Sequence, residues 1–239
     1  MFDKKRRFSY ADQKYQRHLL RWIFVWIFLF FIIYTTLTSL FFSMRVLENE
    51  TMQPGLQKGD KFIFSSHQVY SFIPGQDIVS SLRRGNIVLV DKSLQEQKNF
   101  FTVVVDTLLR FISAQRLTLF NTEDNLFIKR IIGLPGDEIT MNNYIIRVKP
   151  KNELYSFTEF ELWDRPYELK IPSIPALWNE LFPFSGNMEV IVLGDNECFL
   201  LSDDRSNTND SRTWGPVPLD LVSGKALFRY WPFTRAGIP

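Results

Sequence analysis

Lys129 has the clearest capacity for chemistry of any residue in this sequence, because of the segment that carries it. Residues 127–132 read FIKRII. The side chains of a β-strand alternate between its two faces, so Lys129 would share a face with Phe127 and Ile131. An amine between apolar neighbours is poorly hydrated, which disfavours its charged form and suits a general base near neutral pH. The alternative is a lysine on an edge strand whose ammonium reaches water.

Thr51 offers a hydroxyl as the second candidate group. It lies in residues 49–60, NETMQPGLQKGD, nine residues beyond Phe42, where a long apolar run ends. From spacing alone, a threonine followed by proline and glycine is typical of a turn or a cap.

A dense polar loop, residues 202–216, follows a strongly apolar segment. Its sequence is SDDRSNTNDSRTWGP. The simplest interpretation is a solvated turn. A calcium loop is an alternative, but this segment lacks the alternating acidic ligands followed by glycine and the distal glutamate of such loops. We therefore expect no metal ion here.

Cysteine and histidine offer few other routes to chemistry. The single cysteine, Cys198, excludes an intramolecular disulfide and a zinc site built from several thiolates, and its apolar neighbours predict a buried strand residue. His18 belongs to the N-terminal tail, so a Ser/His/Asp triad would have to use His67, which we expect in a loop. The formal net charge is only +2, which argues against a nucleic-acid binder.

The elements that must position these groups are mostly strands. Short alternating or apolar runs, bounded by turn residues, predict seven of them. They are Lys61–Phe64, Asn86–Val90, Phe127–Ile132, Tyr144–Val148, Glu189–Leu193, Glu197–Leu201 and Ala226–Trp231. The sequence 134–137, LPGD, predicts a turn, since proline fixes φ and glycine permits a positive φ. The fold class is therefore all-β, a mainly antiparallel sheet or barrel, with insertions at 93–125 and 149–187. Residues 100–120 predict an amphipathic helix that lies on the membrane or on the domain, and packing in the core is the alternative.

A transmembrane anchor precedes the strands. Residues 22–42, WIFVWIFLFFIIYTTLTSLFF, carry no charge and would form roughly 31 Å of helix, the thickness of the hydrocarbon core. The basic residues before it are Lys4, Lys5, Arg6, Arg7, Lys14, Arg17 and Arg21, whereas only Arg45 lies just after it. This bias places the tail, residues 1–21, in the cytoplasm and residues 43–239 outside. A cleavable signal peptide, the alternative, has a shorter apolar run and a small-residue exit that this segment lacks.

In their order after the anchor, these segments resemble the bacterial type I signal peptidases, also called leader peptidases, the Ser/Lys proteases that remove signal peptides from exported proteins. The matching stretches are Thr51–Pro54 with Gly59-Asp60, Arg84–Val88, Ile128–Asp137, Asp203–Arg212 with Trp214-Gly215, and Val222 through Gly224–Ala226 to Arg229–Trp231. The stretch around Lys129 is nearly the family's standard sequence. Joint occurrence in this order argues against a chance match.

The resemblance implies a membrane-bound endopeptidase with a hydroxyl/lysine dyad and no metal or cofactor. Thr51 stands at the position of the nucleophile and Lys129 at that of the general base. Met52 would flank the substrate groove. Asn49, two residues before the nucleophile, would bind the oxyanion together with the backbone N–H of Thr51.

The polar loop would support this dyad. The resemblance implies that the hydroxyl of Thr208 orients the base, and that Asp210 and Arg212 brace the loop. The partners implied are signal peptides of secretory preproteins and the lipid bilayer, with no nucleic acid. The location implied is the bacterial inner (cytoplasmic) membrane, crossed once, with the catalytic domain on the outer or periplasmic side.

The sequence departs from the family pattern at several positions. The family's serine is Thr51, its Pro-Thr pair is Pro54-Gly55, its Arg-Gly-Asp is Arg84-Gly85-Asn86, and its Gly-Asp-Asn is Ser202-Asp203-Asp204. Threonine keeps the hydroxyl but adds a methyl group that restricts its rotamers. Two alternatives follow. The first is a catalytically silent relative that binds signal peptides or partners at the membrane. The second is a membrane-tethered structural protein, a hypothesis supported only by residues 100–120 and the aromatic insertion.

Overall fold

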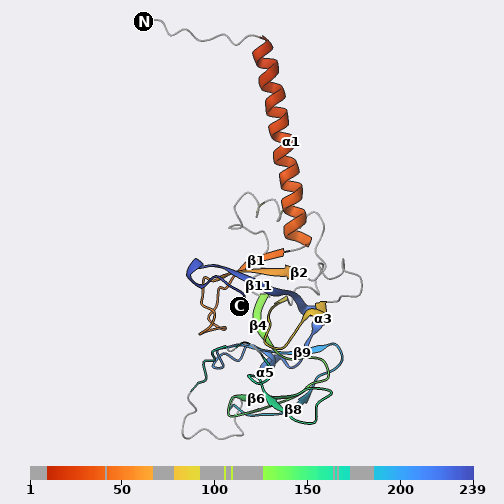
Figure 1. The fold of residues 1–239 in the computed structure, drawn as a ribbon, viewed down its shortest axis with the longest axis vertical. Helices are drawn as coiled ribbons and strands as arrows, with labels where there is room; N and C mark the ends of the chain where they lie inside the picture. Colours follow the sequence, from red (N-terminus) through yellow and green to blue (C-terminus); the bar gives the residue numbers. More distant parts are fainter. Residues whose placement is uncertain are drawn as a thin grey trace.

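A long helix, α1 (Tyr10–Leu40), leads into two antiparallel sheets in the computed structural model of the chain (Figure 1). The structure describes residues 10–40, 42–66, 78–91, 126–163, 167–172 and 186–239, together with residues 105, 109 and 165. Residues 15–34 of α1 are apolar enough to cross a bilayer, and none of this span is buried in the protein. Twenty residues of helix are about 30 Å long, so α1 meets the length requirement of a membrane span.

Seven strands form the sheet next to α1. They are β1 (Phe42–Val46), β2 (Lys61–Ser66), β3 (Ile87–Asp91), β4 (Leu126–Gly133), β9 (Glu197–Leu201), β10 (Val217–Pro218) and β11 (Val222–Trp231). Their order is β1-β2-β11-β3-β4-β9-β10, and each neighbouring pair is antiparallel. β4 therefore lies inside the sheet, between β3 and β9.

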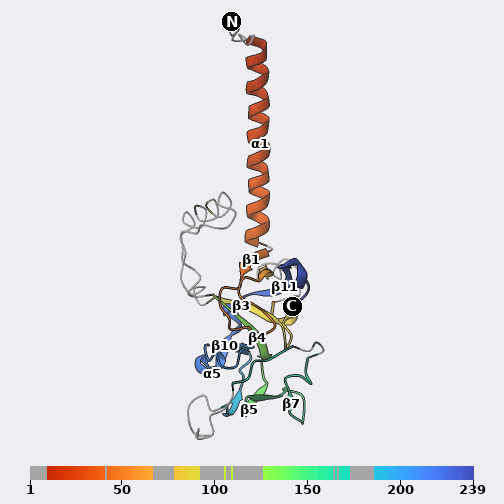
Figure 2. The same ribbon diagram turned by 90° about the vertical axis from the view of Figure 1, so that its left-hand side faces the viewer.

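A second sheet lies at the end of the molecule far from α1, as both views show (Figure 2). It contains β5 (Glu138–Asn142), β6 (Ile145–Lys149), β7 (Phe157–Thr158) and β8 (Met188–Val192), in the order β7-β6-β5-β8. Short helices complete the described chain: α3 (Ile78–Ser81), α5 (Ser211–Trp214), η3 (Leu219–Leu221) and η4 (Phe233–Arg235). The predicted fold class, mainly antiparallel β-structure behind one N-terminal apolar helix, is confirmed.

The turn at residues 134–137 joins the two sheets. Gly136 has a φ of +81°, and the Asp137 N–H donates to the Leu134 carbonyl at 3.1 Å. The Asp137 carboxylate accepts two hydrogen bonds from Arg84 and one from the Leu134 N–H. The turn is thus fixed both by its own backbone and by a contact from the segment before β3.

All seven strands expected from the sequence are strands in the structure. The prediction missed β1, β5, β7 and β10. β1 begins directly after the apolar anchor, which hides its own pattern, and β7 and β10 have only two residues each. The amphipathic helix expected over 100–120 lies outside the described residues except for positions 105 and 109, and so does His67.

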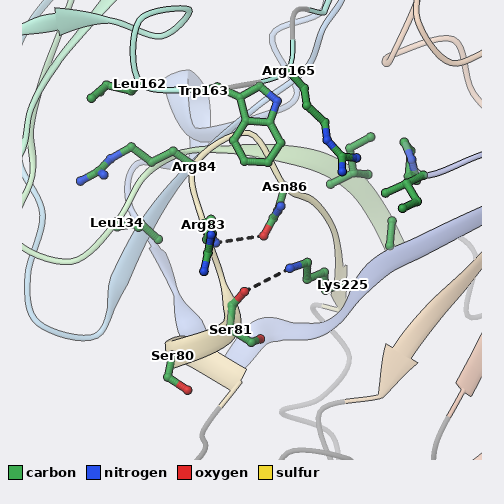
Figure 3. Close-up of a pocket in the computed structure, with 14 residues that line it drawn as sticks. Ser80, Ser81, Arg83, Arg84, Asn86, Leu134, Leu162, Trp163, Arg165 and Lys225 are labelled. Carbon is green, nitrogen blue, oxygen red and sulfur yellow. Dashed lines mark hydrogen bonds between the residues drawn. The ribbon is translucent and has the colours of Figure 1, made fainter.

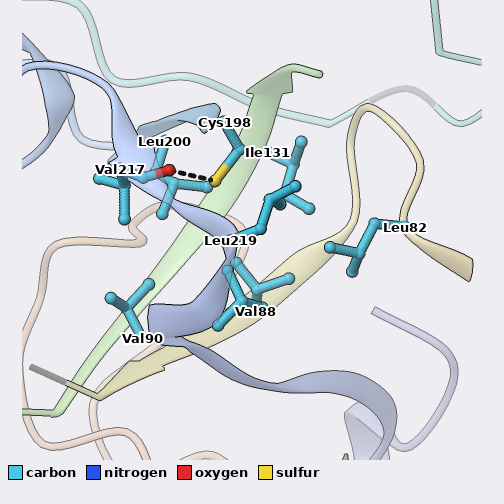
Figure 4. Packing of buried hydrophobic residues seen from close by; sticks show 9 residues of the cluster. Leu82, Val88, Val90, Ile131, Cys198, Leu200, Val217 and Leu219 are labelled. Atoms are coloured by element: carbon cyan, nitrogen blue, oxygen red, sulfur yellow. Dashed lines mark hydrogen bonds between the residues drawn. The ribbon is translucent and has the colours of Figure 1, made fainter. Parts of the chain in front are cut away.

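Cys198 lies on β9 in a cluster of buried apolar side chains (Figure 4). Its neighbours there include Val88, Ile131 and Leu200, and its Sγ donates to the Val217 carbonyl at 3.4 Å. The expectation of a buried strand residue is confirmed.

Burial, reinforced by the charge of Glu197, raises the pKa of the Cys198 thiol to about 12. Because the thiolate is the reactive form, the folded protein should resist DTNB at pH 8 and react with one equivalent once unfolded in guanidinium chloride. Absorbance at 412 nm measures this directly. Rapid labelling of the folded protein would contradict the packing described.

Candidate active site

Lys129 is buried in the middle of β4, with 1% of its surface exposed. Since β4 is paired on both edges, the alternative of an edge-strand lysine reaching water is wrong. Its Nζ donates a hydrogen bond to Ser202 Oγ at 2.7 Å and lies 5.6 Å from the centre of the Trp214 ring. The Trp214 ring in turn packs edge-on against Phe127. The amine therefore sits among apolar groups with a hydroxyl at its tip.

Strand register explains why Ser202 meets Lys129. In the β4–β9 pair, Arg130 is opposite Leu201 and Ile131 is opposite Leu200. One further step along this antiparallel ladder places position 202, just past the end of β9, opposite Lys129. Cross-strand neighbours have their side chains on the same face, so the contact follows from the backbone pairing.

Thr51 lies in the turn that connects β1 to β2, with 8% of its surface exposed. This connection is held by the pair Leu47 N–H to Asp60 carbonyl, 2.8 Å, and Gly59 N–H to Leu47 carbonyl, 2.7 Å. The Asp60 carboxylate also forms ion pairs with Arg229 and Arg235. A closed loop with both ends fixed therefore presents Thr51.

Hydrogen bonds show how the Thr51 side chain is placed. Its Oγ1 donates to Asn49 Oδ1 at 2.8 Å, and its carbonyl accepts from the Asp204 N–H at 3.0 Å. The next residue, Met52, is fully buried in the same apolar cluster as Ile128, the residue before Lys129. The hydroxyl hydrogen is directed to Asn49 in this conformation, and rotation about the Cβ–Oγ1 bond would turn it toward another acceptor.

The start of the polar loop connects the two candidate groups. Ser202 binds the Lys129 amine, and Asp204, two residues later, binds the Thr51 backbone. Thr51 and Lys129, which are 78 positions apart in the sequence, are thus both anchored to residues 202–204. Asn49 joins this site through its hydrogen bond with Thr51, and Met52 joins it through the apolar cluster that it shares with Ile128.

Asp210 and Arg212 hold the polar loop closed. The buried Asp210 carboxylate accepts from the Ser202 N–H at 3.0 Å and from Arg212 Nε and Nη2 at 2.9 and 2.8 Å. Arg212 also donates to the carbonyls of Arg205, at 2.8 Å, and Asn207. Burial alone would raise the pKa of Asp210, but the hydrogen bonds and charge of Arg212 outweigh it and leave that pKa below its usual value.

Thr208 lies further along the same loop and is half-buried. Its carbonyl accepts from the Asp210 N–H at 2.8 Å and from the Thr213 hydroxyl at 2.5 Å. Within the described ranges its own hydroxyl makes no hydrogen bond. Its predicted role toward Lys129 stays a prediction, whereas Ser202, which the sequence did not single out as a site residue, is in contact with the amine.

A buried ionic network, also missed from the sequence, supports the loop from the insertion 149–187. Arg130 pairs with Asp203 through two hydrogen bonds of 2.8 and 2.6 Å. Its guanidinium also stacks 3.9 Å from the centre of the Tyr167 ring. Glu159 accepts from Tyr167 at 2.6 Å and forms an ion pair with Arg205, whose side chain is fully buried. Burial, together with the charge of Glu159, raises the pKa of Tyr167.

Loss of Glu159 should therefore be costly. Glu159→Ala would leave the Arg205 charge buried without its counterion, and two Arg205 nitrogens already have no hydrogen-bond partner among the residues that the structure describes. Such a break costs about 3–5 kcal/mol of unfolding free energy. Urea unfolding followed by tryptophan fluorescence measures it. Glu153→Ala, at an exposed position of the same insertion, is the matched control and should unfold like the wild type; an equal effect of both changes would contradict the role of the network.

Comparison with known proteins shows the family of this chain. The family model described as signal peptidase, peptidase S26, matches residues 19–231. The chain belongs to this family. It is 26% identical to the probable signal peptidase I-1 of Synechocystis over 167 residues, which cover 70% of this chain and 72% of that protein. It is 29% identical to signal peptidase I of Bacillus caldolyticus over 174 residues, covering 73% and 83% of the two chains.

A third relative is signal peptidase I of Leptolyngbya laminosa, 28% identical over 196 residues that cover 81% of this chain and 70% of that protein. The S26 match runs from within α1 to the end of β11, so it includes every predicted site residue. Membership in the signal peptidase family thus agrees with the resemblance of the individual motifs.

The pockets of this S26 chain do not single out the site by their size. A pocket of about 340 Å³ is lined by residues on both sides of Thr51 and Met52, namely Glu50, Gln53, Pro54, Gln57 and Lys58. A pocket of about 760 Å³ lies elsewhere, among Arg83, Arg84, Trp163 and Lys225, and contains none of the predicted site residues (Figure 3). We therefore assign the chemistry by side-chain geometry and not by cavity size. Among the described residues, no group of three or more potential metal ligands was found.

Proposed function

We propose that this chain is a membrane-bound endopeptidase that removes N-terminal signal peptides from exported preproteins with a Thr51/Lys129 dyad. The observation that carries the proposal is Lys129, an amine buried in an S26 signal peptidase chain and anchored to the same loop as the Thr51 backbone. Burial disfavours a charged ammonium, and a neutral amine is what a general base requires.

The dyad would work in four steps. Neutral Lys129 takes the hydroxyl proton of Thr51 as the Thr51 oxygen attacks the scissile carbonyl carbon. The resulting tetrahedral intermediate collapses when the C–N bond breaks, and the Lys129 ammonium gives its proton to the leaving amine. Lys129 then removes a proton from water, which attacks the Thr51 ester. Release of the signal peptide acid restores the hydroxyl and the neutral amine, so no metal or cofactor is consumed or required.

Asn49 and the Thr51 backbone N–H are the groups we assign to the oxyanion. The Asn49 side chain already contacts the Thr51 hydroxyl at 2.8 Å, so it lies within reach of a carbonyl oxygen attacked there. For attack, the hydroxyl must exchange its bond to Asn49 for one to Lys129. That exchange frees the Asn49 amide to turn its N–H₂ toward the developing charge.

The location we propose is the bacterial inner membrane, with the N-terminal tail in the cytoplasm and the sheets outside. The basic residues gathered before α1 support this orientation. β1 begins two residues after α1 ends, and Thr51 follows five residues after β1. A short connection of this kind would keep the nucleophile near the lipid surface, where a translocated signal peptide presents its cleavage site.

A catalytically silent relative is the second candidate function. Two observations favour it: threonine replaces the family's serine, and the Thr51 hydroxyl is bound to Asn49. Such a protein would bind signal peptides in the same groove without cutting them.

Cleavage by the purified full-length protein in detergent micelles tests the proposal. The substrate is a preprotein with alanine one and three residues before the cut, the small side chains that signal peptidases prefer. Mass spectrometry should find a single cut at that site. The same preprotein with bulky residues at these two positions is the control and should stay intact. Binding of the signal peptide without any cleavage would establish the silent relative instead.

A further inference from the structure

Ser202 stands at a position where the signal peptidase pattern has the glycine of Gly-Asp-Asn. A glycine has no side chain to offer, so this chain carries a hydroxyl that the pattern lacks. Ser202 is fully buried, and its Oγ is 2.7 Å from the Lys129 amine. A buried hydroxyl in contact with a buried amine is a specific arrangement, because each group loses water on folding and needs a hydrogen-bond partner in its place.

We propose that Ser202 is the positioning residue for the Lys129 amine, a role that the family pattern gives to the hydroxyl at position 208. The inference rests on the proposed function, since it names a residue that acts through the general base. Ser202 touches neither substrate nor scissile bond in this role; it fixes where the amine points.

The backbone around Ser202 is rigid enough for this role. The preceding residue, Leu201, pairs with Arg130 in the β4–β9 ladder, and the Ser202 N–H donates to the Asp210 carboxylate. Asp210 is itself fixed by Arg212. A backbone held from both sides in this way keeps the Cα of Ser202 in one position relative to the strand that carries Lys129.

Thr208 is placed differently. The Thr208 carbonyl is engaged by Asp210 and Thr213, while its hydroxyl makes no hydrogen bond within the described ranges. Of the hydroxyls of Ser202 and Thr208, it is that of Ser202 that contacts the amine.

The chemical effect is on orientation. Lys129 has four rotatable side-chain bonds, so its amine has many positions to choose from. One N–H bound to Ser202 Oγ fixes where the nitrogen lies, and so where its lone pair can accept the Thr51 proton. Misplacement of a catalytic group by about 1 Å can cost on the order of a hundredfold in rate.

The test compares full-length Ser202→Ala and Thr208→Val with the wild type, in detergent micelles, on the alanine-containing preprotein. Ser202→Ala should lower kcat by about 10- to 100-fold with KM unchanged, because binding does not involve this hydroxyl. The fall in kcat caused by Thr208→Val should be at least tenfold smaller. Ser223→Ala removes a half-buried hydroxyl on β11 that donates to the Leu89 carbonyl, outside the site, and should retain the wild-type kcat.

A second measurement does not depend on cleavage. In protein labelled with ¹³C-lysine, the Cε resonance of Lys129, assigned by its absence in Lys129→Met, should move in Ser202→Ala and stay in place in Ser223→Ala. An unmoved resonance overturns the inference, as does a wild-type kcat in Ser202→Ala or a larger loss in Thr208→Val. If the wild type cleaves no preprotein, the proposed function fails, while the resonance still decides whether Ser202 holds the amine.

Discussion

Lys129→Met should abolish signal peptide cleavage and leave the fold in place. Methionine fills nearly the volume of the lysine stem but has no amine to accept the nucleophile's proton. Loss of a general base costs about 10²–10⁴-fold in rate, and more when the nucleophile depends on it, so we expect a fall in kcat of roughly 10³-fold or more. The site is buried, so an apolar side chain there costs little unfolding free energy. Loss of the bond to Ser202 is offset by removal of a desolvated amine, and the unfolding free energy should stay within about 1 kcal/mol of the wild type.

The measurement pairs kcat on a preprotein with urea unfolding of the same samples. Lys170→Met is the matched control: it removes an amine that pairs with Asp204 in the same loop, but one that is largely exposed. That change should affect kcat far less, since an exposed ion pair contributes little. Substantial cleavage by folded Lys129→Met would rule out Lys129 as the base, whereas collapse of the fold would assign the residue a structural role.

Much of the scaffold around Lys129 could be predicted because it depends on local pattern. The alternation around Lys129 placed it on one face with Phe127 and Ile131, and in the structure Ile131 is buried and Phe127 packs on the ring beside the amine. The turn at 134–137 follows from proline and glycine alone. Such signals involve only neighbouring residues, so they survive without knowledge of the rest of the fold.

The contacts that complete the site could not be read in this way. The pairing of Lys129 with Ser202 depends on the register of β4 against β9. These strands are neighbours in the sheet, but in the sequence all the strands of the second sheet lie between them. A visible hint existed, since serine replaces the expected glycine, but a polar residue in a polar loop has no pattern of its own. Glu159 and Tyr167 were hidden for a similar reason: they belong to irregular backbone, and only tertiary contacts with Arg130 and Arg205 give them a role.

Thr51→Ser should raise the rate of cleavage. Threonine carries a methyl group on the same carbon as its hydroxyl, which limits the χ1 rotamers available. In this chain the hydroxyl is turned to Asn49, and the side chain is nearly buried. Removing the methyl group lets the hydroxyl rotate toward Lys129 with less steric hindrance. Because small errors in the position of a reacting atom cost up to about a hundredfold, we expect kcat to rise by roughly 10- to 100-fold.

Thr51→Val separates this effect from packing. Valine has the shape of threonine without the hydroxyl, so it preserves the buried methyl group and removes the nucleophile. Thr51→Val should cleave nothing above background, and Thr51→Ser should cleave faster than the wild type. The measurement is kcat at saturating preprotein for all three proteins. Cleavage by Thr51→Val would remove Thr51 from the dyad. An inactive wild type whose Thr51→Ser variant cuts would show that the lysine base is intact and that the threonine alone silences it, because nothing else in the site differs between the two proteins.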